Sequence, residues 1–263
     1  MVLFRGDIKC KSLQRRTSLS VILPADNIHY LQGTEEIAEK PYKTLYLLHG
    51  LFGSDDIFLA NTTIQKFAED HNIAVVLPSG ENSFYVDQKE SHKYYGEFIG
   101  RELVEMTRNI FPLSHKKEDT YLAGFSMGGY GAIRNGLKYH DNFGYIGAIS
   151  AALLTDDLHN WGEGDDLLSS KSFAQSCFGD LNNVIGSDMD PKFLIDDLIA
   201  NDIEIPKIFM AVGDNDFLYD ENIDYYNYLK SRNVDVEFRC SSGEHTWEFC
   251  NDYIKEFIEW LPL

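Results

Sequence analysis

Short apolar runs, bounded by glycine or proline, constrain the fold of this chain more than any other feature of its sequence. Runs of this kind are typical of strands buried on both faces of a parallel sheet. Stretches with apolar residues at helical spacing lie between several of them. Because strands that alternate with helices form βαβ units, we expect an α/β fold, with a mainly parallel, twisted sheet covered by helices on both faces. The strands are expected at 43–49, 74–78, 120–124, 145–150, 207–213 and 234–240, and the helices at 97–111, from 128 onward and at 252–260.

Two parts of the chain depart from this pattern. Residues 7–13 and 17–23 alternate polar with apolar side chains, which predicts half-exposed antiparallel strands. Residues 151–205 are irregular, acidic and aromatic, and this stretch is too long for an ordinary loop. The chain shows no internal repeat and no Pro/Ser-rich linker. We therefore expect a single domain over residues 1–263, with a cap-like insertion at about 151–205.

Composition excludes several classes of function. The 263 residues include 23 Lys and Arg against 42 Asp and Glu, a formal net charge of −19. This balance disfavours nucleic acid and anionic membrane surfaces as partners, because clustered basic residues bind both. No run approaches the roughly 18 apolar residues of a membrane-spanning helix, and the N-terminus lacks the pattern of a signal peptide. The composition leaves homo-oligomerisation open.

The cysteines and the acidic residues predict no metal site. No two cysteines have CxxC spacing, and no Cys/His cluster resembles a zinc site. Four aspartates of the irregular segment do not have the spacing of a calcium loop, so we expect a solvated acidic face there. We expect no cofactor, and a cytoplasmic chain with reduced thiols. The cysteines are Cys10, Cys177, Cys240 and Cys250, and the aspartates are Asp188, Asp190, Asp196 and Asp197.

The sharpest motif is Gly124-Phe125-Ser126-Met127-Gly128, a G-x-S-x-G sequence between a predicted strand and a predicted helix. This is the context of a nucleophile elbow, in which small residues two positions before and after the serine permit a sharp turn. The turn exposes the serine hydroxyl, and the helix N-terminus behind it favours developing negative charge. Ser126 is therefore the predicted nucleophile.

A serine nucleophile needs a base and an orienting acid, and chains with this elbow carry them in the order serine, acid, histidine. Three histidines follow Ser126. His140 lies at the end of the next helix, and His159 lies in the irregular segment. His245 lies in a loop directly after the last predicted strand, where the loops of an open α/β sheet converge. We expect His245 to be the base.

The acid is expected after the penultimate strand, where Asp214 and Asp216 lie two residues apart. Asp216 lies beyond the turn and can reach across to His245. Asp214 is better suited to end the strand through a turn with its own backbone. Asp220 and Glu221 are more remote candidates on the following helix. Asp216 is the preferred acid, with Asp214 as the alternative.

Stabilisation of an oxyanion needs a second backbone donor besides the residue after the nucleophile. The strand at 43–49 ends in a short loop with glycines on both sides, Gly50 and Gly53. The expected donors are the amides of Leu51 and Met127, with Phe52 as the alternative if the loop is shifted. His49 is expected to be structural.

Four segments together resemble the esterase D family of α/β-hydrolases: LLHGLFGS, GFSMGGYGA, GDNDFLYDEN and GEHTWEFC. This family includes tributyrin esterases, S-formylglutathione hydrolases, feruloyl and acetylxylan esterases and the antigen 85 mycolyltransferases. The resemblance covers the chain from about residue 40 to its end and is strongest to the cytoplasmic tributyrin esterases. It implies an α/β-hydrolase fold, with Ser126, Asp216 and His245 as catalytic residues and Leu51 and Met127 as oxyanion donors.

The predicted function is a serine carboxylesterase that hydrolyses short-chain acyl esters, small molecules, through an acyl-enzyme on Ser126. The alternatives are a feruloyl or acetylxylan-type esterase that acts on plant-polysaccharide esters, an S-formylglutathione-type thioesterase and an acyltransferase. A non-catalytic domain that keeps the fold is a further alternative.

Short acyl chains are expected because bulky residues of the insertion can close the acyl side of the pocket. The same residues can instead form a small core of the insertion, or stack on a feruloyl ring. Acidic residues of the insertion disfavour docking on a lipid surface. The bulky residues are Leu153, Leu154, Leu158, Trp161, Leu167, Leu168, Phe173 and Phe178, and the acidic ones are Asp156, Asp157, Glu163, Asp165 and Asp166.

Overall fold

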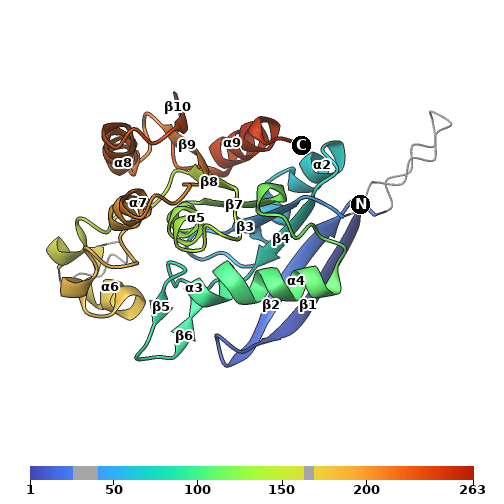
Figure 1. Ribbon diagram of the computed structural model, residues 1–263, viewed down its shortest axis with the longest axis horizontal. Helices are drawn as coiled ribbons and strands as arrows, with labels where there is room; N and C mark the ends of the chain where they lie inside the picture. Colours follow the sequence, from blue (N-terminus) through green and yellow to red (C-terminus); the bar gives the residue numbers. More distant parts are fainter. Residues whose placement is uncertain (26–40, 163–168) are drawn as a thin grey trace.

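The computed structural model describes residues 1–25, 41–162 and 169–263. The strands of its main sheet are β1 (Val2–Cys10), β2 (Arg15–Leu23), β3 (Thr44–Leu48), β4 (Ala74–Pro78), β7 (Thr120–Phe125), β8 (Tyr145–Ile149), β9 (Lys207–Gly213) and β10 (Val236–Ser241). They lie in the order β1-β2-β4-β3-β7-β8-β9-β10 (Figure 1). Neighbours from β4 to β10 are parallel, whereas β1 pairs with β2, and β2 with β4, in antiparallel fashion. The predicted parallel sheet and its antiparallel start are confirmed. The expectation that residues 17–23 are half-exposed is wrong, because β2 lies between β1 and β4, with Val21 in one apolar core and Ile22 in the other.

Helices cover both faces of this sheet, as expected. Within β3, Leu45 and Leu47 point into one apolar core, and Tyr46 and Leu48 into the other, because successive side chains of a strand alternate between faces. The first core is closed by α1 (Ile57–Asn61), α2 (Ile64–Asp70) and α9 (Trp247–Trp260). The second core is closed by α4 (Leu103–Ile110), α5 (Met127–Lys138) and α8 (Tyr219–Ser231). Figure 1 shows α2 and α9 on one side of the sheet and α4 on the other.

Three further elements differ from the predictions. Strand β10 is half-buried or exposed instead of buried on both faces, because it lies at the edge of the sheet and has one neighbouring strand. The helix expected at 97–111 begins as α3 (Tyr95–Glu97), passes through a π-helical turn at Phe98–Glu102 and continues as α4, which ends before Pro112. The last helix begins at Trp247, where the Thr246 hydroxyl caps it by accepting the Phe249 amide at 3.3 Å.

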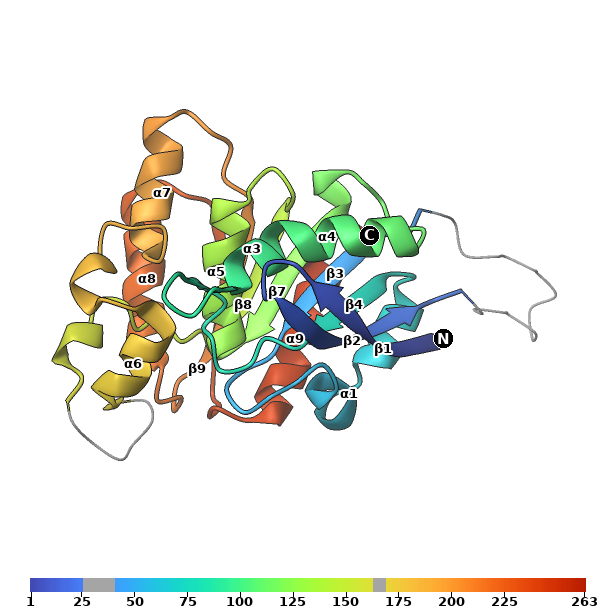
Figure 2. The ribbon, with the colours of Figure 1, turned by 90° about the horizontal axis from the view of Figure 1, so that it is seen from below.

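The described residues between β8 and β9 include the helices α6 (Lys171–Phe178) and α7 (Pro191–Ala200), and short 3-10 turns at Leu158–Asn160 and Leu181–Asn183. Figure 2 shows α6 and α7 at the end of the molecule opposite the N-terminus. Strands β5 (Asp87–Gln88) and β6 (Lys93–Tyr94) form a small antiparallel ribbon, and α6 packs against β5. None of the helices in the described ranges is long and apolar enough to cross a membrane.

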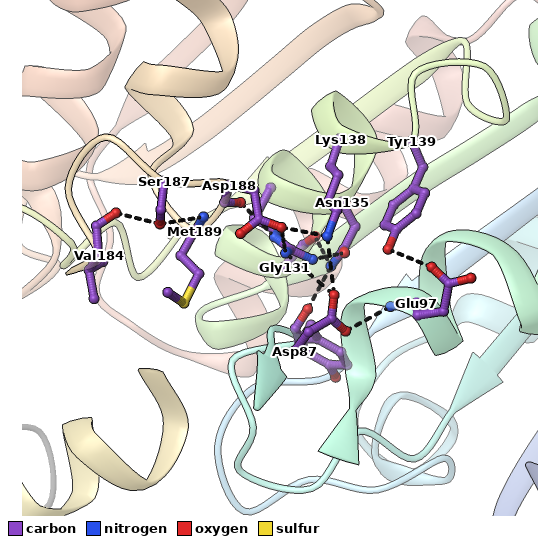
Figure 3. Close-up of polar contacts among 12 residues, drawn as sticks. Asp87, Glu97, Gly131, Asn135, Lys138, Tyr139, Val184, Ser187, Asp188 and Met189 are labelled. Atoms are coloured by element: carbon purple, nitrogen blue, oxygen red, sulfur yellow. Dashed lines mark hydrogen bonds and ion pairs between the residues drawn. The ribbon is translucent and has the colours of Figure 1, made fainter. Parts of the chain in front are cut away.

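Ion pairs join this segment to α5 and β5 (Figure 3). The fully buried Arg134 of α5 donates to the Asp188 carboxylate at 2.7 Å and to its backbone carbonyl at 2.8 Å. Lys138 contacts Asp188 and also lies 3.1 Å from the Asp87 carboxylate of β5. Asp188 is therefore partnered by basic side chains, and the expectation of a merely solvated acidic face is wrong for it.

The other aspartates of that group also have protein partners. Asp190 caps α7 by accepting the Lys192 amide at 2.9 Å. The Asp196 carboxylate lies 2.7 Å from the Arg232 guanidinium.

In the part of the chain that the structure describes, no three His, Cys, Asp or Glu side chains are grouped so that they could hold a metal ion.

Candidate active site

Ser126 lies at the tight turn between β7 and α5. Its backbone has φ 60° and ψ −120°, a conformation that residues with a Cβ rarely adopt. Surrounding backbone bonds hold it there: the Ser126 amide donates to the Ile149 carbonyl at 3.0 Å, and its carbonyl accepts the amides of Gly129 and Ala152 at 2.9 and 3.0 Å. Strain of this kind persists only where the structure over-determines it, as at functional sites.

The glycines of the G-x-S-x-G motif are required by close backbone contacts. A Cβ on Gly124 would lie 2.2 Å from the Gly128 carbonyl oxygen. A Cβ on Gly128 would lie 2.0 Å from the carbonyl oxygen of Leu48 in β3. The strand and the helix can therefore approach closely enough to form the sharp turn only because both residues lack a side chain.

Asp216 and His245 are brought together from two loops at the same end of the sheet. Asp216 follows β9, and His245 lies between β10 and α9. The His245 Nδ1 atom lies 2.9 and 3.1 Å from the two Asp216 carboxylate oxygens. Because a carboxylate accepts, we assign the proton to Nδ1, which leaves Nε2 as the basic nitrogen.

The Asp216 side chain has no exposed surface. Burial on its own raises the pKa of this carboxyl, but hydrogen bonds to its ionised form outweigh burial, and the pKa lies below the usual value of 3.8. Those bonds come from the His245 ring, from the Ser150 side chain and from the Leu218 amide, which donates at 2.9 Å. Asp216 is therefore a fixed negative charge behind the imidazole at neutral pH.

Two phenylalanines position the His245 ring. The Phe125 ring stacks on it with centroids 4.6 Å apart, and the Phe217 ring contacts it at the same distance. Phe125 directly precedes Ser126, so this stacking holds the imidazole beside the nucleophile elbow. Neither contact is predicted by the sequence patterns, although Phe217 belongs to the segment GDNDFLYDEN.

Asp214 and the other histidines have surroundings that differ from those of Asp216 and His245. Asp214 accepts the Gly243 amide at 3.1 Å and so fastens the loop that carries His245. His49 is buried and structural, as predicted: its Nε2 accepts the Gly80 amide at 2.8 Å, and its Nδ1 lies 2.7 Å from the Gly50 carbonyl. His140 pairs with Asp141 just after α5. His159 is exposed on the turn at Leu158–Asn160.

The loop after β3 passes beside Ser126. A Cβ on Gly50 would lie 3.2 Å from the Cβ of Ser126. The Gly53 amide donates to the Gly50 carbonyl at 3.3 Å, which closes a turn whose two middle residues are Leu51 and Phe52. The Phe52 amide is occupied, because it donates to Asn82 Oδ1 at 2.8 Å.

Within the described residues, the Leu51 amide has no hydrogen-bond acceptor, and neither has the amide of Met127 at the first position of α5. Unpaired amides beside a serine hydroxyl are the groups that bind an oxyanion. The geometry therefore favours Leu51 over Phe52 as the second donor.

Known proteins resemble this chain over nearly its whole length. The esterase family model, described as "Putative esterase", matches residues 10–259. An acetyl esterase from Caldicellulosiruptor saccharolyticus is 41% identical over 262 residues, which cover 99% of this chain and 98% of that protein.

Two solved structures from Staphylococcus aureus are also similar. The fluorophosphonate-binding serine hydrolase F, with substrate bound, has a TM-score of 0.86 and 33% identity, covering 99% of this chain and 98% of the other. The S-formylglutathione hydrolase, as apoenzyme, has a TM-score of 0.84 and 32% identity, with the same two coverages. The chain therefore belongs to the esterase family matched here, within the esterase D group of α/β-hydrolases that its motifs resemble.

Proposed function

We propose that this serine carboxylesterase cleaves its esters through an acyl-enzyme on Ser126, with His245 as base and Asp216 as the acid that orients it. One observation carries the assignment: the His245 ring is bonded to the buried Asp216 and stacked on Phe125, the residue before Ser126. The family match and the acetyl esterase relative support ester hydrolysis as the reaction.

The proposed reaction has two stages. Ser126 Oγ attacks the ester carbonyl while His245 Nε2 takes the hydroxyl proton, and Asp216 stabilises the imidazolium without taking a proton itself. The amides of Leu51 and Met127 donate to the oxyanion of the tetrahedral intermediate. His245 then gives the proton to the departing alcohol oxygen, which leaves Ser126 acylated. Water, activated by the same imidazole, attacks the acyl-enzyme and releases the carboxylic acid.

We propose short acyl chains, such as acetyl and butyryl, as the substrate class. The acetyl esterase relative supports this size. Of the bulky insertion residues, Leu153, Leu158, Trp161 and Phe178 are buried in the core, so the apolar surface they offer a long chain is small. Leu154 and Phe173 are half-buried against the same core. Leu167, Leu168, Glu163, Asp165 and Asp166 lie outside the described residues.

A thioesterase that acts on S-formylglutathione is a second candidate, because the S. aureus S-formylglutathione hydrolase is 32% identical. An aryl ester is a third candidate, because Phe217 is 60% exposed against the His245 ring and offers a stacking surface. Both candidates use the same nucleophile. The thioesterase differs in its leaving group, a thiol, and the aryl esterase in the aromatic group that it binds.

We also propose that the chain is one domain in which residues 151–205 act as a cap. The support is the packing of α7 against α5 and the ion pairs between Asp188 and that helix. We propose the cytoplasm as the location, because all four cysteines are free thiols and free thiols persist in a reducing compartment.

The test is a panel of p-nitrophenyl esters, feruloyl esters and S-formylglutathione, assayed with the wild type and with Ser126→Ala. We expect acetyl and butyryl esters to be hydrolysed fastest, and Ser126→Ala to lose activity by several orders of magnitude while its melting temperature stays the same. If that variant keeps more than about a tenth of wild-type activity, Ser126 is not the nucleophile. Faster hydrolysis of octanoyl than of butyryl esters contradicts the proposed preference for short acyl chains.

A further inference from the structure

The segment from Gly80 to Tyr85 lies against the turn at Gly50–Gly53 and is held in a strained backbone conformation. Three of its residues that carry side chains have positive φ: Glu81 at 48°, Phe84 at 51° and Tyr85 at 56°. Each such residue costs free energy, so the surrounding contacts must enforce the conformation. The contacts of this segment lead to the residues on both sides of Ser126.

On one side, the segment holds the turn after β3. The Gly80 amide donates to His49 Nε2 at 2.8 Å, and the Tyr85 hydroxyl donates to the His49 carbonyl at 2.9 Å. Asn82 Oδ1 accepts the Phe52 amide at 2.8 Å. On the other side, the Phe84 amide donates to the sulfur of Met127 at 3.4 Å. One short segment therefore contacts the neighbourhoods of both proposed oxyanion donors.

The Asn82 contact has a particular consequence for the turn. Phe52 has φ 62°, in the left-handed region, and its ring is 80% exposed, so side-chain packing contributes little to holding it there. The turn has two middle amides, and Asn82 occupies that of Phe52. The amide of Leu51 is left without an acceptor in the described residues, and the preceding Gly50 lies against Ser126.

Asn82 is itself held from behind by the insertion. Its backbone carbonyl accepts the Cys177 thiol of α6 at 3.2 Å. The two residues share the wall of a cavity of about 570 Å³ between this segment and α6. The Asn82 backbone is thus anchored independently of the hydrogen bond that its side chain makes with Phe52.

We infer that Asn82 is a positioning residue for ester hydrolysis: its side-chain oxygen locks the turn at Gly50–Gly53 so that the Leu51 amide points to the oxyanion. The inference rests on the proposed function, because it requires a tetrahedral oxyanion on Ser126. It acts through the backbone of the turn, and Asn82 does not touch the substrate.

The test compares Asn82→Leu, which keeps the size and removes the acceptor, with Asn82→Asp, which keeps an acceptor oxygen. Asn82→Ser, whose hydroxyl is too short to reach the Phe52 amide, is a second loss variant should the leucine disturb folding. Gln88→Leu is the matched control, because Gln88 lines the same cavity and bonds the Gln175 carbonyl of α6 at 3.3 Å without contacting the turn.

Hydrolysis of p-nitrophenyl acetate and inhibition by a trifluoromethyl ketone are measured for each variant. The ketone forms a tetrahedral adduct with Ser126, so its binding reports on stabilisation of the oxyanion without the later steps of turnover. We expect Asn82→Leu and Asn82→Ser to lower kcat by about 10- to 100-fold with little change in KM, and to weaken ketone binding by a similar factor. Asn82→Asp should recover part of kcat, at least threefold over the leucine variant, and Gln88→Leu should behave as wild type.

Three results would overturn the inference: kcat of a folded Asn82→Leu or Asn82→Ser within about twofold of wild type, a fall in kcat without weaker ketone binding, or no recovery in Asn82→Asp. Failure of the proposed function looks different. In that case the wild type does not hydrolyse the acetate, or Ser126→Ala retains the activity, whatever the Asn82 variants do.

Discussion

At the scale of single residues, two aspartates two positions apart have separate tasks. Asp216 contacts the His245 ring, whereas Asp214 contacts the backbone of the loop that carries it. Asp216→Asn should lower kcat by roughly 10³- to 10⁴-fold, because an amide can turn its NH₂ toward Nδ1 and favour the wrong tautomer. Asp214→Asn keeps an oxygen for the Gly243 amide and should have a much smaller effect. Steady-state kinetics of the two variants decide, and equal losses would contradict the assignment.

The glycine two residues after the nucleophile gives a second prediction at this scale. Because a Cβ on Gly128 would lie 2.0 Å from the Leu48 carbonyl, Gly128→Ala must displace α5 or β3. We expect a loss of about 1–3 kcal/mol in the free energy of unfolding and a large loss of activity. Gly162→Ala is the control, because no residue that the structure describes lies within 4 Å of the Cβ it would add. Urea denaturation measures both, and wild-type stability in Gly128→Ala would show that the close contact is relieved at no cost.

At the scale of elements, the pairing of Arg134 with Asp188 joins α5 to the segment before α7. Arg134 is fully buried, but the Asp188 side chain is 45% exposed, so solvent screens part of the attraction. Asp188→Asn should lower the free energy of unfolding by about 1–2 kcal/mol. Asp196→Asn breaks the exposed pair with Arg232 and should change it by less than about 1 kcal/mol. Chemical denaturation measures the free energy of unfolding of both variants. Equal losses would show that the pair with the buried arginine stabilises the protein no more than the exposed pair does.

At the scale of the whole molecule, the same carboxylate links stability to pH. Burial raises the pKa of Asp188, but Arg134 and Lys138 outweigh this and hold it below 3.8. A carboxyl whose pKa is lowered by folding stabilises the protein fully above its unfolded pKa, and this contribution is lost as the pH falls through the folded pKa. The stability difference between wild type and Asp188→Asn should therefore be constant near pH 7 and shrink below pH 3.8. A difference that persists in strong acid would show that charge is not its source.

Local patterns predict much of the fold and the loops that carry the candidate site residues. The strand positions were predictable because a strand buried in a parallel sheet needs a continuous apolar run, and the elbow because a tight turn between strand and helix needs small residues around Ser126. Asp216 and His245 were predictable from their places after β9 and β10, since the ends of parallel strands meet at one edge. These features depend on residues close together in the chain.

Only the tertiary structure decided the features that depend on distant partners. The Phe52 amide is occupied by Asn82, thirty residues further on. The position of the His245 ring depends on Phe125 and Phe217, which come from two other segments. Sequence periodicity reports which face of an element is apolar, but it carries no information on which side chain from elsewhere completes a hydrogen bond or a ring stack. Those pairings arise only when the sheet brings its loops together.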